Sequence, residues 1–157
     1  MKQIRSSPAA SVSDLMTAAQ RLQARRLARA HTLLAPLGLT GARWQLLDAI
    51  VRAGEPQSAP QLAATLGLTR QGVQKQLDLL AADGLLGAQP NPRHRRSPRY
   101  GPGAAGQRLH ASASALQAAW DARLAAGLPA AELADALGIL KALHARLDDS
   151  LPVSPAG

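Results

Sequence analysis

The feature that most constrains the fold is the segment 58–86, with the sequence SAPQLAATLGLTRQGVQKQLDLLAADGLL. Ser58 is expected to cap a short helix, and Pro60 falls in its first turn, where a missing amide donor costs little. Gly67 is expected to make a tight turn, and Thr69 to cap a second amphipathic helix. A short helix, a glycine-containing turn and a second helix together predict a helix-turn-helix.

The second helix of this segment has two unlike faces. At about 100° per residue, Val73, Leu77 and Leu80 cluster within about 60° of one another. Gln71 and Lys75 point to the opposite side, so the helix offers long polar side chains once its apolar face is buried. Such a surface fits the major groove of DNA, which accepts one α-helix and presents hydrogen-bonding base edges.

Gly72 lies in the first turn of that helix, where glycine destabilises a helix by about 1 kcal/mol relative to alanine. Its presence fits a close approach of the DNA backbone, which a side chain at this position would obstruct. The alternative is that this glycine has no role.

A change of pattern follows Gly84. Two short segments, 85–89 and 99–101, flank the basic loop PNPRHRRSP, and this arrangement predicts a β-hairpin, or wing. Arginines on such a loop can bind phosphates or enter the minor groove, whose negative potential attracts guanidinium groups. The alternative is a loop whose charges serve only solubility.

The composition agrees with a helical protein that binds a polyanion. The chain has no Phe and one Tyr, so its core is built from Leu and Ala, which favour packed helices over a β-sandwich. Residues 60–110 contain seven basic and two acidic side chains, and residues 1–31 contain six and one. Positive charge gathered in this way suggests nucleic acid as the partner, with solubility as the simpler explanation.

Helical periodicity flanks the central segment on both sides. Ser13 is expected to cap an N-terminal helix, and Thr40 to cap a helix in which Trp44 is a core residue. Beyond the hairpin, a helical stripe resumes at about Ala104, is interrupted at Gly127 and returns in a last leucine-rich helix.

Several classes of function are not supported. No apolar run approaches the roughly 20 residues needed to cross a bilayer, so no membrane partner is expected. The absence of cysteine excludes disulfides and thiolate metal sites, and it fits a cytoplasmic protein. The four histidines are scattered, so no metal or other cofactor is expected. No nucleophile motif or glycine-rich phosphate loop occurs, so the chain is not expected to be an enzyme.

Three stretches of the chain resemble the multiple-antibiotic-resistance regulator (MarR) family of winged helix-turn-helix repressors. They are LTGARWQLLDAI, PQLAATLGLTRQGVQKQLDLLAADGLL and NPRHRRSPRYGPGAAG, and the resemblance spans about residues 13–148. Two positions depart from the family pattern. His94 stands where the family has a wing aspartate, which fixes an arginine matched here by Arg96. Pro102-Gly103 replaces a Leu-Thr pair, which predicts a shortened return strand.

The resemblance implies a mainly α fold with a small β-hairpin wing, that is, a winged helix-turn-helix with N- and C-terminal dimerisation helices. The expected organisation is a disordered N-terminus (1–11), a dimerisation helix (12–35), a winged helix-turn-helix DNA-binding domain (36–103), C-terminal dimerisation helices (104–149) and a flexible tail (150–157). The resemblance further implies a homodimer that binds a pseudo-palindromic operator in double-stranded DNA, with half-sites about one helical turn apart.

The family's mode of action implies a repressor that a small aromatic ligand releases from DNA. The candidate pocket residues are His31, Trp44 and Trp120, each with a plain core role as the alternative. The residues expected to contact DNA are Ser58, Thr69, Arg70, Gln71, Gln74, Lys75, Arg93, Arg95 and Arg96. The alternative function is a winged-helix protein-interaction module, or a degraded regulator with little sequence-specific DNA binding, and the altered wing supports it.

Overall fold

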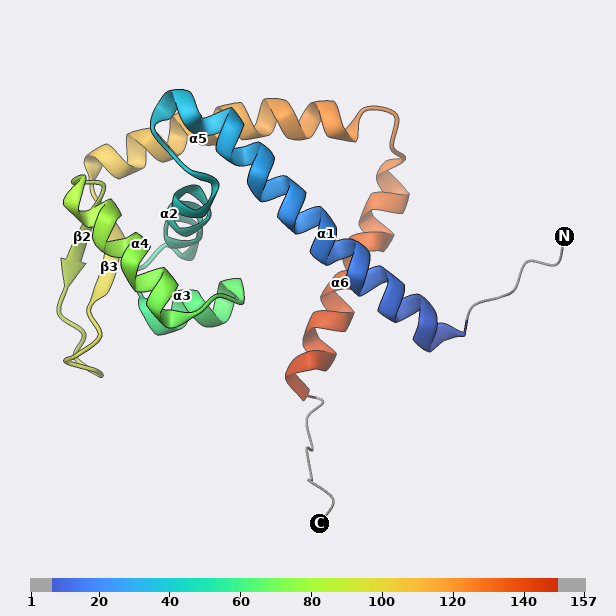
Figure 1. Cartoon of the computed structure of the whole chain (residues 1–157), viewed down its shortest axis with the longest axis horizontal. Helices are drawn as coiled ribbons and strands as arrows, with labels where there is room; N and C mark the ends of the chain where they lie inside the picture. Colours follow the sequence, from blue (N-terminus) through green and yellow to red (C-terminus); the bar gives the residue numbers. More distant parts are fainter. Residues whose placement is uncertain (1–6, 150–157) are drawn as a thin grey trace, which may run out of the picture. The chain divides into compact units, whose positions relative to one another are not determined.

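The computed structural model describes residues 7–149 and divides the chain into two compact units, Met1–Ala119 and Trp120–Gly157. Residues 1–6 and 150–157, which include most of the predicted disordered start and the predicted flexible tail, lie outside the described residues. The elements in chain order (Figure 1) are α1 (Pro8–Leu34), the 3-10 helix η1 (Ala35–Leu37), α2 (Gly41–Ala53), β1 (Gln57–Ser58), α3 (Ala59–Leu66), α4 (Arg70–Ala82), β2 (Leu86–Gln89), β3 (Arg99–Pro102), α5 (Ala104–Ala125) and α6 (Ala130–Asp149).

The predicted fold class is confirmed, because α3 and α4 form a helix-turn-helix and the β2–β3 hairpin follows α4 directly (Figure 1). The apolar face of α4 is buried as predicted: Val73, Leu77 and Leu80 are each at most 1% exposed. The rest of this core comes from α2, α3 and the sheet: Leu46, Leu47, Ile50, Ala59, Leu62, Ala63, Leu86 and Tyr100. α4 and the wing are therefore held by one core.

The sheet has one strand more than the sequence indicated. β1 pairs with β3, which also pairs with β2, so the antiparallel order is β1-β3-β2. The predicted shortening of the return strand is wrong, because β3 is four residues long and Pro102 lies opposite Leu86. β1 covers only Arg99 and Tyr100, so at Pro102 one side of β3 has no neighbouring strand. The missing N–H of proline can face that side without loss of a ladder hydrogen bond.

The first helix begins earlier than predicted. α1 starts at Pro8, and Ser7 Oγ accepts a hydrogen bond from Ala10 N at 3.2 Å, so Ser7 and not Ser13 is the N-cap. A serine followed by proline is a start signal of its own, and the alanine-rich residues that follow favour helix. The predicted helix 12–35 is therefore longer at its N-terminal end.

A second cluster joins the end of α1 to α2 and α5, and its buried members are Ala30, Leu34, Leu39, Trp44 and Ala113. Trp44 is 5% exposed, which confirms its predicted core role. Its ring stacks on that of His110 from α5, with centroids 5.2 Å apart and 22° between the ring planes. His110 Nε2 lies 2.9 Å from Asp48 Oδ1, so this cluster ends in a polar contact between α5 and α2.

Two glycines allow close contacts between elements. A Cβ at Gly41, the first residue of α2, would lie 2.5 Å from the backbone oxygen of Leu27 in α1. A Cβ at Gly106, in the first turn of α5, would overlap the backbone oxygen of Leu85, which immediately precedes β2. Gly103 N donates to the same Leu85 oxygen at 3.0 Å. α5 therefore begins in direct backbone contact with the start of the wing.

Two helices expose large apolar side chains. Those of α1 are 36–68% exposed and belong to Val12, Leu15, Met16 and Leu22. In the second unit, no described residue of α6 is buried, and large apolar side chains that are 42–57% exposed belong to Leu133, Leu137, Ile139, Leu140 and Leu147. Large apolar side chains left exposed along a helix favour contact with another molecule. Over residues 7–149, no helix combines the length and the apolar character required to span a membrane.

Gly106→Ala is expected to destabilise the fold by about 1–3 kcal/mol, because its Cβ has to displace the Leu85 backbone. Gly138→Ala is the matched control: this glycine also lies in a helix, but nothing lies within 4 Å of a Cβ there. The control should be neutral or stabilising, because alanine favours helix by about 1 kcal/mol over glycine. Urea unfolding at one fixed protein concentration measures both variants, and equal midpoints would contradict the close contact.

Candidate nucleic-acid interface

The outward face of α4 carries most of the side chains predicted to contact DNA. Gln74 is half-buried, and the exposed members of this face are Thr69, Arg70, Gln71 and Lys75. Thr69 caps α4 as predicted, because its Oγ1 accepts a hydrogen bond from Gly72 N at 3.2 Å. Since the core fixes the inward face of the helix, these polar side chains are held toward solvent.

The structure gives Gly72 an intramolecular role. A Cβ at this position would lie 2.9 Å from Thr69 Oγ1, the oxygen that caps the helix. Glycine leaves room for the cap, so its presence does not by itself indicate a nearby DNA backbone.

A hydrogen-bond network ties Gln74 to the wing. Gln74 Nε2 donates to Asp78 Oδ1 at 2.7 Å and to the Tyr100 hydroxyl at 2.8 Å. The Tyr100 hydroxyl donates to the same Asp78 oxygen at 3.4 Å. Tyr100 belongs to β3, and it is 4% exposed within the core. The network therefore joins the second turn of α4 to the central strand of the sheet, a link that sequence reasoning missed.

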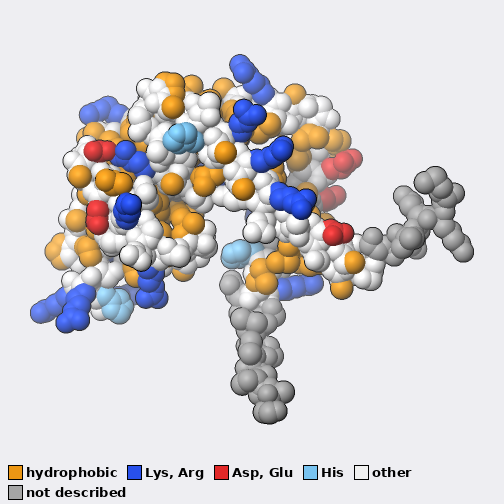
Figure 2. All heavy atoms as spheres, viewed as in Figure 1, with side chains coloured by type: hydrophobic (Ala, Val, Ile, Leu, Met, Phe, Trp, Pro, Cys, Tyr) orange, Lys and Arg blue, Asp and Glu red, His pale blue; other side chains and the backbone are white. Residues whose placement is uncertain are grey.

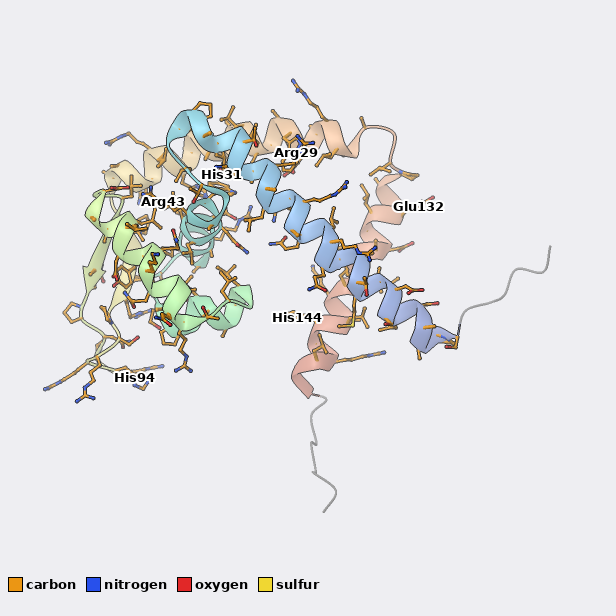
Figure 3. All side chains as sticks on the ribbon, viewed as in Figure 1. Arg29, His31, Arg43, His94, Glu132 and His144 are labelled. Atoms are coloured by element: carbon orange, nitrogen blue, oxygen red, sulfur yellow. The ribbon has the colours of Figure 1, made fainter. Side chains whose placement is uncertain are left out.

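Asn91 organises the tip of the wing. Its Nδ2 donates to Ser97 O at 2.9 Å, and its Oδ1 accepts from Arg93 N at 3.2 Å. Backbone hydrogen bonds from His94 N to Asn91 O and from Ser97 N to His94 O complete the turn, at 3.2 and 2.9 Å. Figure 3 shows His94 at the end of the hairpin. The turn presents the exposed side chains of three arginines.

The wing is also fixed at its base by Arg99, which sequence reasoning did not single out. Arg99 Nε donates to Pro56 O at 2.7 Å, and its guanidinium lies 3.3 Å from Glu55 Oε2. Arg99 and Pro56 are 43 residues apart in the chain, so no local pattern in the sequence indicated their contact.

An open hollow of about 1060 Å³ lies between the wing and the start of α4. Its cationic lining consists of Arg70 from α4, Arg99 from β3 and the wing arginines Arg93, Arg95 and Arg96, with His94 beside them. Glu55 is the acidic residue in this lining. Lys and Arg side chains gather with a histidine at this end of the hairpin in Figure 2. The structure thus brings Arg70 of α4 together with the three wing arginines, and all four were predicted to contact DNA.

Ser58, also predicted to contact DNA, has a capping role. Its N–H and its hydroxyl both donate to Gln61 Oε1 at 2.9 Å, and Ser58 is 5% exposed. This geometry favours initiation of α3 over a DNA contact. Ser58 also borders the hollow, so its contact with a phosphate stays a prediction.

The three residues predicted to line a ligand pocket are distributed over both units. Trp44 borders a recess of about 40 Å³ in the first unit, His31 is exposed and outside its lining, and Trp120 belongs to the second unit. A recess of this volume holds about one or two water molecules and not an aromatic ring. A site for an aromatic ligand therefore stays a prediction. Among residues 7–149, no group of three metal-ligating side chains is placed to hold an ion.

Sequence comparison relates this interface to known proteins. The model of the MarR family matches residues 37–97, from the end of η1 through α2, α3 and α4 to the wing. Uncharacterised proteins of Mycobacterium bovis and Mycobacterium tuberculosis are 46% identical to this chain over 61 residues. The match covers 39% of this chain and 41% of theirs, so it spans less than half the length of these curated relatives.

Solved structures extend the likeness over most of the chain. A MarR-family transcriptional regulator from Rhodococcus sp. RHA1 is 25% identical with a TM-score of 0.74, covering 87% of this chain and 96% of that one. A mutant of E. coli MarR complexed with operator DNA is 21% identical with a TM-score of 0.71, covering 88% and 99%. CouR from Rhodococcus jostii RHA1, bound to p-coumaroyl-CoA, is 22% identical with a TM-score of 0.69, covering 79% and 86%.

The family match lies over the helix-turn-helix and the wing, and the structural matches add the flanking helices. The fold is therefore that of a winged-helix transcription regulator. Residues 37–97 match the model of the MarR family, and the fold of most of the chain is similar to that of a MarR-family regulator.

Asn91→Ala is expected to loosen the wing tip without unfolding the core. The change removes hydrogen bonds to Ser97 and Arg93, each of which contributes about 1 kcal/mol. The total of about 2 kcal/mol corresponds to about 30-fold faster cleavage of the loop by trypsin, because the open form is more populated. Gln89→Ala, on the exposed end of β2, is the control. Mass spectrometry measures the rates of cleavage, and equal rates for the two variants would show that Asn91 does not order the wing.

Proposed function

We propose that this chain is a homodimeric, sequence-specific DNA-binding transcription regulator. The observation that carries the proposal is the outward polar face of α4 beside a wing with three exposed arginines. α4 has the width and polarity that the major groove accepts, and Gln71 and Lys75 supply hydrogen-bonding groups for base edges. The wing arginines reach phosphates or the neighbouring minor groove. The E. coli relative complexed with operator DNA supports this role.

Self-association is part of the proposal. The exposed apolar side chains of α1 and of α6 supply surface that water disfavours, and a second copy of the chain offers the same surface in return. A two-fold symmetric dimer presents two copies of α4 to two half-sites. The proposed operator is therefore a pseudo-palindrome.

We also propose that the regulator is a repressor released by a small aromatic ligand. CouR, which is bound to p-coumaroyl-CoA in its structure, supports this idea. A ligand that binds the DNA-free conformation more tightly than the DNA-binding conformation lowers the affinity of the protein for DNA. The largest possible reduction equals the ratio of the ligand's affinities for the two conformations. The proposal places the protein in the cytoplasm, where prokaryotic operator DNA lies, and gives it no catalytic activity.

Selection of bound duplexes from a random pool tests sequence-specific binding and half-site spacing together. The expected product is a pseudo-palindrome with half-sites about one helical turn apart. Affinity should fall steeply with salt concentration, because protein contacts with phosphates release counterions. Equal affinity for selected and scrambled DNA would instead favour a protein-interaction module or a degraded regulator.

Gln71→Ala and Arg96→Ala should separate base contacts from phosphate contacts. Gln71→Ala should weaken binding to the selected operator by about 5- to 100-fold, and binding to scrambled DNA much less. Arg96→Ala should weaken both about equally and reduce the salt slope by about one. Fluorescence anisotropy measures these affinities, with Lys141→Ala on α6 as the control for lost charge. A wild-type titration curve from Arg96→Ala would refute the role of the wing.

Leu137→Glu should convert the proposed dimer to monomers, because it places a charge on an apolar face that the dimer buries. At about 100° per residue, Ala142 lies on the opposite side of α6, so Ala142→Glu is the matched control and should remain dimeric. Sedimentation equilibrium measures the mass of each variant. A monomeric wild type would refute the homodimer, and a dimeric Leu137→Glu variant would remove α6 from its interface.

A further inference from the structure

We infer that Gln74 acts as a hydrogen-bond acceptor only, and that it selects an amino base, adenine or cytosine, at one position of each half-site. The inference rests on the proposed function, since it assigns a base preference to the helix that we place in the major groove. It limits the bases that Gln74 can contact to those that donate a hydrogen bond. Neither the family resemblance nor the exposure of the α4 side chains supplies this limit.

The first step is the state of the Gln74 amide nitrogen. A glutamine Nε2 carries two hydrogens and can donate two hydrogen bonds. Here one goes to Asp78 Oδ1 at 2.7 Å and the other to the Tyr100 hydroxyl at 2.8 Å. Both donors of Gln74 are therefore used inside the protein, and neither is available to a base.

The second step is the orientation of the amide. An ionised carboxylate only accepts hydrogen bonds, so the group of Gln74 that faces Asp78 at 2.7 Å has to be the nitrogen. An amide turned by 180° would set its oxygen against the carboxylate oxygen, without a proton between them. The Tyr100 hydroxyl supports the same orientation, because it accepts from Gln74 while it donates to Asp78.

The third step is the rigidity of this arrangement. Tyr100 is 4% exposed and its ring is part of the core, so its hydroxyl is held in place by packing. Asp78 lies four residues after Gln74 on the same helix, the spacing at which helical side chains meet. Gln74 is thus fixed from two elements, α4 and β3.

The fourth step concerns the remaining group, Gln74 Oε1. Within residues 7–149 no hydrogen bond is donated to this oxygen, and it is not among the buried polar atoms that lack a partner. It is therefore an open acceptor on the polar side of α4. Water satisfies it in free protein, and a donor on DNA can replace that water.

The base chemistry follows from this. In the major groove adenine N6 and cytosine N4 are donors, whereas guanine O6 and thymine O4 are acceptors. The common two-bond contact of glutamine with adenine needs a free N–H for adenine N7, which Gln74 does not have. The predicted preference is therefore for adenine or cytosine about equally, over guanine or thymine on the same strand.

The experiment begins with duplexes selected by the wild-type protein. The position that Gln74 contacts is defined as the one at which Gln74→Ala loses base preference. Four operators that differ only at this position are then titrated with wild-type protein. We expect adenine and cytosine to bind about fivefold more tightly than guanine and thymine, as one hydrogen bond allows.

Asp78→Ala tests the mechanism directly. Without the carboxylate the amide is free to turn, so the four operators should bind within about twofold of one another. Overall affinity should not fall, because the variant also removes a negative charge near DNA. Asp14→Ala on α1 removes the same charge without touching the network and should keep the preference. Tyr100→Phe leaves the carboxylate to orient the amide but frees one Gln74 N–H, so adenine should then bind more tightly than cytosine.

The outcomes separate this inference from the proposed function. A pool that yields no preferred sequence would refute sequence-specific binding itself. A preferred operator that Gln74→Ala leaves unchanged at every position would overturn only the present inference. The same holds if guanine or thymine is preferred, or if Asp78→Ala retains the wild-type preference while thermal unfolding shows that it is folded.

Discussion

The burial of one face of α4 is the interaction on which the rest of the structure depends. Val73, Leu77 and Leu80 lose nearly all contact with water, and each such side chain contributes about 1.5–3 kcal/mol when fully buried. The angular spacing of residues in an α-helix is fixed, so fixing the inward residues also fixes the outward ones. Gln71 and Lys75 therefore face solvent without any further interaction that orients them.

The wing packs on the same core, so the two elements predicted to contact DNA, α4 and the β2–β3 hairpin, are held in a fixed relation to each other. Leu86 of β2 and Tyr100 of β3 pack in the cluster that holds α4, and Arg99 fastens β3 to the segment before β1. In the proposed complex, α4 in the major groove and the hairpin at the backbone bind one duplex simultaneously. Because they share a core, little conformational freedom has to be lost when both make contact.

Local signals were sufficient to predict the helix-turn-helix and the wing, because caps such as Thr69 and the period of the leucines involve residues only a few positions apart. The features that the sequence did not reveal depend on distant partners. The two residues of β1 form a strand only because they pair with β3. Arg99 donates a hydrogen bond to Pro56, and His110 contacts Asp48, which lies 62 residues away in the chain. The start of α1 was misplaced for another reason, since several serines near the N-terminus are good caps and only Ser7 precedes a proline.

The two ends of the hairpin are joined at its base. There, Gly103 N donates a hydrogen bond to the Leu85 oxygen, and Gly106 packs against the same oxygen. Changes in the length of the loop between β2 and β3 are therefore confined to that loop and are not passed on to α5. Evolution, or an engineer who grafts a loop from a homologue, can remodel this tip while α4, the helix proposed to contact bases, stays as it is. If the proposed roles hold, the affinity for DNA backbone and the preference for base sequence can change through separate mutations in one gene.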